Sequence, residues 1–142
     1  MARDVLVRGG KVRYAQNIIV GHHLLHADEP VQANGRDAGP DPYELLLAAL
    51  GACISITLRM YADRKQWPLE DVSVRLNYGR VYADDCASCD GELKLIDAIQ
   101  VQLAVTGNLS EIQRKRLLEI AERCPVHRTL ASPIQIVTTL AL

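Results

Sequence analysis

The chain has 142 residues, four cysteines, no phenylalanine and a formal net charge of −1 at pH 7. This length is typical of one domain with its own hydrophobic core, so we expect a single domain over residues 1–142. Its 16 basic residues nearly balance its 17 acidic ones, so no nucleic acid or anionic membrane surface is expected as a partner.

The cellular compartment is predicted from the N-terminus and the apolar pattern. The start, MARDVLVRGG, has no apolar run after its charges and does not resemble a secretory signal. We therefore expect a cytoplasmic protein, with its cysteines in a reducing compartment. The uncharged run Leu45–Leu58 would span about 21 Å as a helix, short of the roughly 30 Å hydrocarbon core, which predicts a buried helix and not a membrane span.

The first part of the chain predicts a small sheet and a loop. The glycine pair at 9–10, with the apolar residues that follow, is typical of a hairpin and a following strand. The sequence HHLLH is typical of a strand edge, in which His22 and His26 would share one face. Residues 26–41 are dense in turn formers and predict a loop.

A long apolar helix is predicted after this loop. Asp41 can cap it, Glu44 stands three residues later as in a capping box, and Trp67-Pro68 predicts its end. Residues 45–58 are apolar on every side, so one sheet would not cover them. We expect a second copy of the chain to do so, and the alternative is a central helix wrapped by its own strands. Close approach of two helices is expected at the small residues Ala48, Ala49, Gly51 and Ala52.

The second half predicts two strands, a helix and a last strand. Apolar and polar residues alternate over 72–78 and 99–106, as in half-buried strands. A capping-box pattern at Ser110 predicts a helix to about Arg123. A last strand is predicted by three apolar residues, Ile134, Ile136 and Leu140. This order of elements indicates an α+β protein.

Two cysteines are candidates for thiol chemistry. Cys53 lies within the apolar helix, where a cysteine is often a small core residue. Cys124 precedes Pro125, which disfavours helical geometry at Cys124 and suits the first position of a new helical turn. This predicts Cys124 as a helix N-cap, where free N–H groups favour a thiolate, and His127 and Arg128 could add positive potential. The alternative is two unrelated apolar cysteines.

The motifs GPDPYELLLAALGAC at 39–53 and RCPVHRTL at 123–130 resemble those of the OsmC/Ohr family of osmotically inducible and organic hydroperoxide resistance proteins. The resemblance implies an intertwined homodimer, with strands of both chains wrapped around two long buried central helices. It implies a thiol peroxidase with Cys53 as the peroxidatic and Cys124 as the resolving cysteine. No cofactor or metal is expected, and the implied partners are an organic hydroperoxide and a dithiol reductant such as dihydrolipoamide.

The chemistry suits these residue types. A thiolate cleaves the peroxide bond and leaves a sulfenic acid at Cys53, with which Cys124 condenses to a disulfide that an external dithiol reduces. Apolar surroundings suit alkyl or fatty-acid hydroperoxides. The alternative function is an OsmC-like dimer that binds a small lipophilic ligand or acts as a redox sensor.

One position departs from the family pattern. The well-studied peroxidases carry a glutamate ten residues before the first cysteine, where it holds an arginine against the sulfur. Here that position is Tyr43 and the acid is Glu44, about 100° further around the helix, so Glu44 is a candidate both for the site and for a capping-box acid alone. A cation is expected near Cys53, and the candidates are Arg13, Arg36, Arg59 and Arg128.

The other two cysteines have CxxC spacing. Cys86 and Cys89 lie in DDCASCDG, which permits a zinc half-site or a redox pair. A structural zinc needs four ligands, and the sequence has no second CxxC. The histidines at 22, 23 and 26 could supply the rest only if the loop between the strands folds back onto them. We expect free thiols or an incidental disulfide, and a redox role and a zinc-stabilised protein remain the alternatives.

Overall fold

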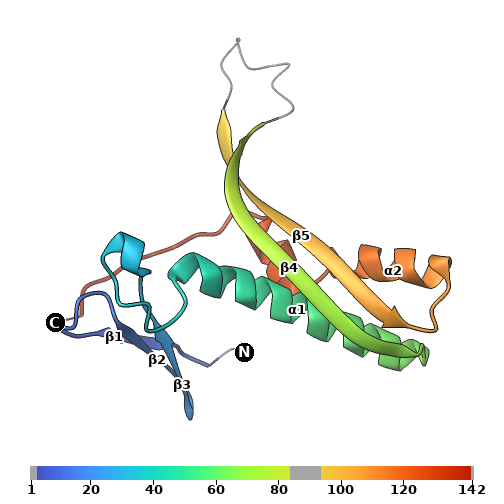
Figure 1. Cartoon of the computed structure of the whole chain (residues 1–142), viewed down its shortest axis with the longest axis horizontal. Helices are drawn as coiled ribbons and strands as arrows, with labels where there is room; N and C mark the ends of the chain where they lie inside the picture. Colours follow the sequence, from blue (N-terminus) through green and yellow to red (C-terminus); the bar gives the residue numbers. More distant parts are fainter. Residues whose placement is uncertain (1–2, 84–93, 142) are drawn as a thin grey trace. The chain divides into compact units, whose positions relative to one another are not determined.

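The computed structural model describes residues 3–83 and 94–141, and Figure 1 traces the elements in chain order. The chain divides into two compact units, Met1–Leu46 and Leu47–Leu142, and each is described by itself. Helices and antiparallel strands make up the described residues, which confirms the predicted α+β class. Cys86 and Cys89, with the zinc and redox alternatives attached to them, lie outside the described residues.

The described part of the first unit contains an antiparallel sheet in the order β1-β2-β3, formed by β1 (Leu6–Gly9), β2 (Gln16–Val20) and β3 (His23–Ala27). This confirms the predicted hairpin. Gly21 and His22 form the tight turn between β2 and β3, and Gly21 adopts a φ of +58° that favours glycine. The prediction that His22 and His26 share a strand face is therefore wrong, because His22 belongs to the turn.

The loop before the long helix is built around a buried carboxylate. Asp28 is 2% exposed, and its carboxylate accepts hydrogen bonds from the backbone N–H groups of Glu29 at 2.7 Å, Ala38 at 3.1 Å and Arg36 at 3.3 Å. These donors, Ala38 first among them, hold the pKa of Asp28 below its usual range. The loop also contains the short 3-10 helix η1 (Val31–Ala33). The predicted loop is confirmed, and a single side chain organises it.

The helix α1 (Pro42–Lys65) begins with the predicted capping box. Asp41 Oδ1 accepts from the Glu44 N–H at 2.8 Å, and Glu44 Oε1 accepts from the Asp41 N–H at 2.9 Å. The helix ends just before Gln66, whose φ is +57°. By length and composition α1 could cross a membrane, a test that the core helices of soluble proteins also pass.

Within the second unit, α1 is buried on one face and exposed on another. Leu50, Ile54 and Leu58 recur every four residues and are at most 4% exposed. Ile56 and Met60 are 56% and 65% exposed. The described residues of the second unit therefore cover only part of this all-apolar helix.

Two long strands, β4 (Leu69–Tyr82) and β5 (Leu95–Gly107), form an antiparallel ribbon that lies along α1 (Figure 1). Both predicted strands are confirmed and are longer than expected. Gly51 is buried against this ribbon, since a Cβ at Gly51 would lie 2.8 Å from Leu76 Cδ1. The prediction that Gly51 mediates the approach of two helices is wrong, because the side chain of Leu76 on β4 of the same chain fills the space beside Gly51.

The second unit is completed by α2 (Glu111–Ala121) and α3 (Pro125–Leu130). Ser110 caps α2 with both hydrogen bonds of a capping box, as predicted. The core of this unit draws on α1, β4, α2 and the start of α3, and its buried residues are Leu50, Ile54, Leu58, Tyr61, Ala62, Leu69, Leu117, Ile120, Ala121 and Cys124.

The predicted last strand is wrong for the described chain. Residues 133–141 have no regular secondary structure. Ile134, Ile136 and Leu140 are 52%, 82% and 87% exposed. Apolar alternation reports a preference for an extended backbone, but a strand also needs a neighbour to accept and donate its hydrogen bonds.

Candidate thiol site

Cys124 is the N-cap of α3, as the proline after it predicts. Its backbone is extended, with φ −62° and ψ 146°, and Pro125 occupies the first helical position. The Cys124 Sγ accepts a hydrogen bond from the His127 N–H at 3.3 Å. Cys124 is 0% exposed and belongs to the core. A sulfur here takes the place of the side-chain oxygen that ordinarily caps a helix.

Cys53 reaches the same turn from α1. Its side chain is half-buried and packs against the core cluster that contains Cys124. The Cys53 Sγ accepts from the Val126 N–H at 3.5 Å, so the two sulfurs contact consecutive backbone amides of α3. Residues more than seventy positions apart in the sequence therefore meet at one short helix.

The two thiols affect each other electrostatically. Burial is the largest effect on Cys124 and raises the pKa of its thiol, while the hydrogen bond from the His127 N–H lowers it. A hydrogen bond with the Cys53 thiol, and the charge that Cys53 carries when ionised, raise the pKa of Cys124 further. Cys124 thus favours its neutral form, and Cys53 is the sulfur with access to solvent.

Glu44 is engaged at the start of α1. Its Oε1 accepts from the Asp41 N–H in the capping box, which occupies one carboxylate oxygen. Tyr43, at the family's glutamate position, is 55% exposed. The capping geometry accounts for the acid at Glu44, and a role in the site stays a prediction.

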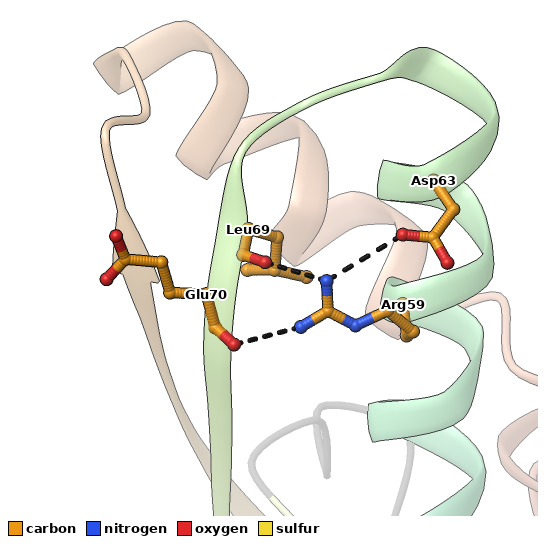
Figure 2. A network of polar contacts seen from close by, with 4 residues as sticks. All are labelled: Arg59, Asp63, Leu69 and Glu70. Carbon is orange, nitrogen blue, oxygen red and sulfur yellow. Dashed lines mark hydrogen bonds and ion pairs between the residues drawn. The ribbon is translucent and has the colours of Figure 1, made fainter.

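Arg59, one of the candidate cations, ties α1 to β4 (Figure 2). Its guanidinium donates to the backbone carbonyls of Leu69 at 2.7 Å and Glu70 at 3.0 Å, and lies 3.7 Å from the Asp63 carboxylate. A guanidinium has five N–H donors in a fixed fork, and this one is directed at the start of β4. The contacts of Arg59 are therefore structural.

The other candidate cations lie in different places. Arg13 belongs to the first unit, where its guanidinium donates to the Asn34 carbonyl at 2.8 Å. Arg36 belongs to the Asp28 loop of the same unit. Arg128 lies on α3, four residues after Cys124, and lines a shallow hollow of about 450 Å³. Which of them serves Cys53 stays a prediction.

The sequence predicted free N–H groups at this turn, but not which of them would contact the two sulfurs. The N–H groups of Val126 and His127 contact the two sulfurs, although neither side chain marks them. The signal was present in Pro125, because a proline marks the first helical position and the N–H groups of a first helical turn have no intrahelical partners. That Cys53 meets them depends on tertiary packing, which no local pattern encodes.

The described residues do not indicate a metal site of three or more ligands. Within residues 3–83 and 94–141, no group of three or more His, Cys, Asp and Glu side chains is arranged to hold a metal ion. The histidines at 22–26 fit this result, since His26 Nδ1 instead lies 3.0 Å from Asn17 Oδ1.

Solved structures of similar fold cover nearly the whole chain. An OsmC-like protein of Mycoplasma pneumoniae has 20% identity and a TM-score of 0.66 over 92% of this chain and 88% of that one. An organic hydroperoxide resistance protein OsmC of Legionella pneumophila has 21% identity and a TM-score of 0.63 over 92% and 90%. The organic hydroperoxide resistance protein OhrB of Bacillus subtilis has 22% identity and a TM-score of 0.56 over 91% and 90%. These likenesses establish the fold.

Family membership rests on a match of the sequence itself. A comparison with curated proteins finds no match. The family model for OsmC-like proteins matches residues 35–139, a range that includes α1 with Cys53 and α3 with its cap Cys124. Because that model covers well over half of the chain, the protein belongs to the OsmC-like family.

Proposed function

We propose that the protein is a cytoplasmic thiol peroxidase that reduces organic hydroperoxides, with Cys53 as the attacking and Cys124 as the resolving sulfur. The observation that carries the proposal is the meeting of these two thiols at consecutive amides of α3. Membership of the OsmC-like family supports it, as do the hydroperoxide resistance proteins of similar fold.

The first step is attack by the accessible sulfur. The Cys53 thiolate displaces an alkoxide from the hydroperoxide, and Cys53 becomes a sulfenic acid. The released alkoxide takes up a proton to give the alcohol. The Val126 N–H contacts the Cys53 Sγ and is placed to stabilise negative charge on that sulfur. The apolar face of α1 around Cys53 favours an alkyl or fatty-acid hydroperoxide, whose tail needs an apolar surface.

The second step uses the buried thiol. The Cys124 sulfur attacks the Cys53 sulfenic acid, water leaves, and a disulfide forms. A thiol kept neutral by burial does not compete for the peroxide, and it is held beside its target. An external dithiol such as dihydrolipoamide then reduces the disulfide by exchange and becomes a cyclic disulfide itself.

The active form is proposed to be a homodimer. Ile56 and Met60 expose an apolar face of α1, and residues 133–141 expose apolar side chains on an extended backbone. Exposed apolar surface of this kind marks an interface, and a second copy would cover it.

A second function is favoured by one observation. Because Glu44 is held in the capping box and Tyr43 stands at the family's glutamate position, the arginine clamp of the best-studied peroxidases has no acid at its usual place. A homodimer without this clamp could bind a small lipophilic ligand, or act as a redox sensor, without efficient peroxidase turnover.

Single-cysteine variants test the roles directly. Cys53→Ser should abolish the consumption of cumene hydroperoxide, because the attacking sulfur is lost. Cys124→Ser should keep the first-turnover burst but lose dithiol-dependent turnover, with Cys53 stopping at sulfenic acid or over-oxidising. The matched controls Cys86→Ser and Cys89→Ser should leave both phases nearly unchanged. Wild-type protein that consumes no alkyl hydroperoxide with any dithiol would favour the binding function instead.

A further inference from the structure

Two adjacent thiols are also metal ligands, and this chemistry is independent of peroxide. Cys53 and Cys124 come from different elements and contact neighbouring amides, so the fold itself pairs them. Soft thiolate sulfur selects soft cations such as Cu(I). We propose that Cys53 and Cys124 form a two-thiolate site for a soft monovalent cation of the Cu(I) class.

The binding step balances without any change of oxidation state. Two thiols release two protons, and the cation forms one bond to each sulfur. A coordinated thiol is deprotonated outright, so the preference of buried Cys124 for its neutral form does not prevent binding. The product carries one net negative charge, which the N–H groups of Val126 and His127 are placed to stabilise.

The ligand count determines which ions fit. Zinc in a structural site takes four protein ligands, whereas Cu(I) and Ag(I) are stably bound by two thiolate sulfurs. Within the described residues, no third His, Cys, Asp or Glu joins the two thiols in a metal-binding group. The pair therefore selects a two-coordinate ion over zinc.

A metal ion would enter the site through the Cys53 sulfur. Cys53 is half-buried and Cys124 is 0% exposed, so the ion meets Cys53 first and completes its coordination at Cys124. A bound ion would occupy both sulfurs and block any attack on a hydroperoxide. The site would then act as a point of inhibition by soft metals.

Silver in nitrate buffer is a suitable probe, since Ag(I) is soft and does not oxidise thiols. The reduced Cys86→Ser/Cys89→Ser double variant serves as the background, because it retains only the two thiols in question. The expected result is one Ag(I) per chain that survives an excess of the monothiol N-acetylcysteine, measured by native mass spectrometry. Adding Cys53→Ser or Cys124→Ala should weaken retention by about 10²- to 10⁴-fold, because the second sulfur otherwise binds intramolecularly.

A second measurement avoids substitutions in the site. Bound Ag(I) should protect Cys53 of the background protein from iodoacetamide, and the modified residue is identified by peptide mapping. Loss of the ion to the monothiol, or equal retention by the Cys53→Ser variant, would overturn the proposal. Hydroperoxide consumption is assayed separately, so a protein that retains Ag(I) but consumes no hydroperoxide would contradict the proposed enzyme and leave this site intact.

Discussion

At the scale of single residues, the thiol site follows from one proline and two backbone amides. Pro125 determines the extended geometry of Cys124, and that could be predicted from the sequence because both residues are adjacent. The contact between Cys53 and the Val126 N–H could not, because it joins two elements through tertiary packing. Glu44 shows the reverse case, in which a local capping pattern accounts for an acid that stands one residue beyond the family's glutamate position.

The stability of the protein should depend on pH through Cys124. Burial raises the pKa of this thiol in the folded state, so the folded protein holds the proton more tightly than the unfolded chain. This pKa difference stabilises the folded protein fully below the unfolded pKa of about 8.5. The stabilisation is lost as the pH rises through the pKa of Cys124 in the folded state. The free energy of unfolding measured in urea should therefore fall as the pH rises above about 8.5. The Cys124→Ala variant should have a shallower slope, and an unchanged slope would contradict a neutral buried thiol.

Glu44 can be tested as a capping residue. Glu44→Ala removes the acceptor for the Asp41 N–H and should lower the free energy of unfolding by about 1 kcal/mol, the usual scale of a helix cap. Glu44→Gln, the matched control, keeps an acceptor and should retain most of the stability. Neither change should alter hydroperoxide consumption much. Loss of activity in a fully stable Glu44→Gln variant would instead place the carboxylate in the site.

At the scale of elements, local signals predicted where the helices begin, whereas strand formation and helix packing depend on tertiary partners. Capping boxes and prolines predicted where α1, α2 and α3 begin, because these signals act within one turn. The strand expected at 134–140 is absent from the described chain, since no periodicity supplies its partner. Gly51 was assigned to the wrong surface for a similar reason, because a stripe of small residues does not reveal which neighbour approaches it.

Gly51 and Ala52 separate the two faces of α1. Gly51→Leu would drive a side chain into Leu76 of β4 and should lower the free energy of unfolding by about 1–3 kcal/mol. Ala52→Leu, its exposed neighbour, should leave the stability of the isolated fold nearly unchanged. Chemical denaturation compares the two in the Ile56→Glu background, where the proposed dimer is disrupted, because Ala52 lies on the same exposed face of α1 as Ile56. Equal destabilisation would mean that Gly51 is not the contact with β4.

At the scale of the whole molecule, the unexplained surface is apolar. Exposed Ile56, Met60 and the residues at 133–141 suit contact with a second copy better than contact with water. The all-apolar pattern of residues 45–58 predicted that the helix would need a second copy, whereas residues 134–140 were expected to form a strand. The identity of the partner lies beyond a single chain. The homodimer is therefore a proposal that solution measurements must test.

Sedimentation velocity tests the proposed dimer. The wild-type protein should sediment as a dimer at micromolar concentration. Ile56→Glu would bury a charge at the proposed interface and should shift the protein towards monomer. Lys65→Glu, a charge change at the end of the same helix, is the matched control and should keep the dimer. A stable wild-type monomer at this concentration would contradict the proposed homodimer.

The pairing of two distant thiols in one reaction is tested most directly by a single oxidation. Reduced wild-type protein is treated with one equivalent of cumene hydroperoxide, quenched with an alkylating agent, and mapped by peptide mass spectrometry. The proposed mechanism predicts a disulfide between Cys53 and Cys124, with Cys86 and Cys89 still alkylated. A disulfide confined to Cys86 and Cys89, or an over-oxidised Cys53 beside a free Cys124, would contradict it.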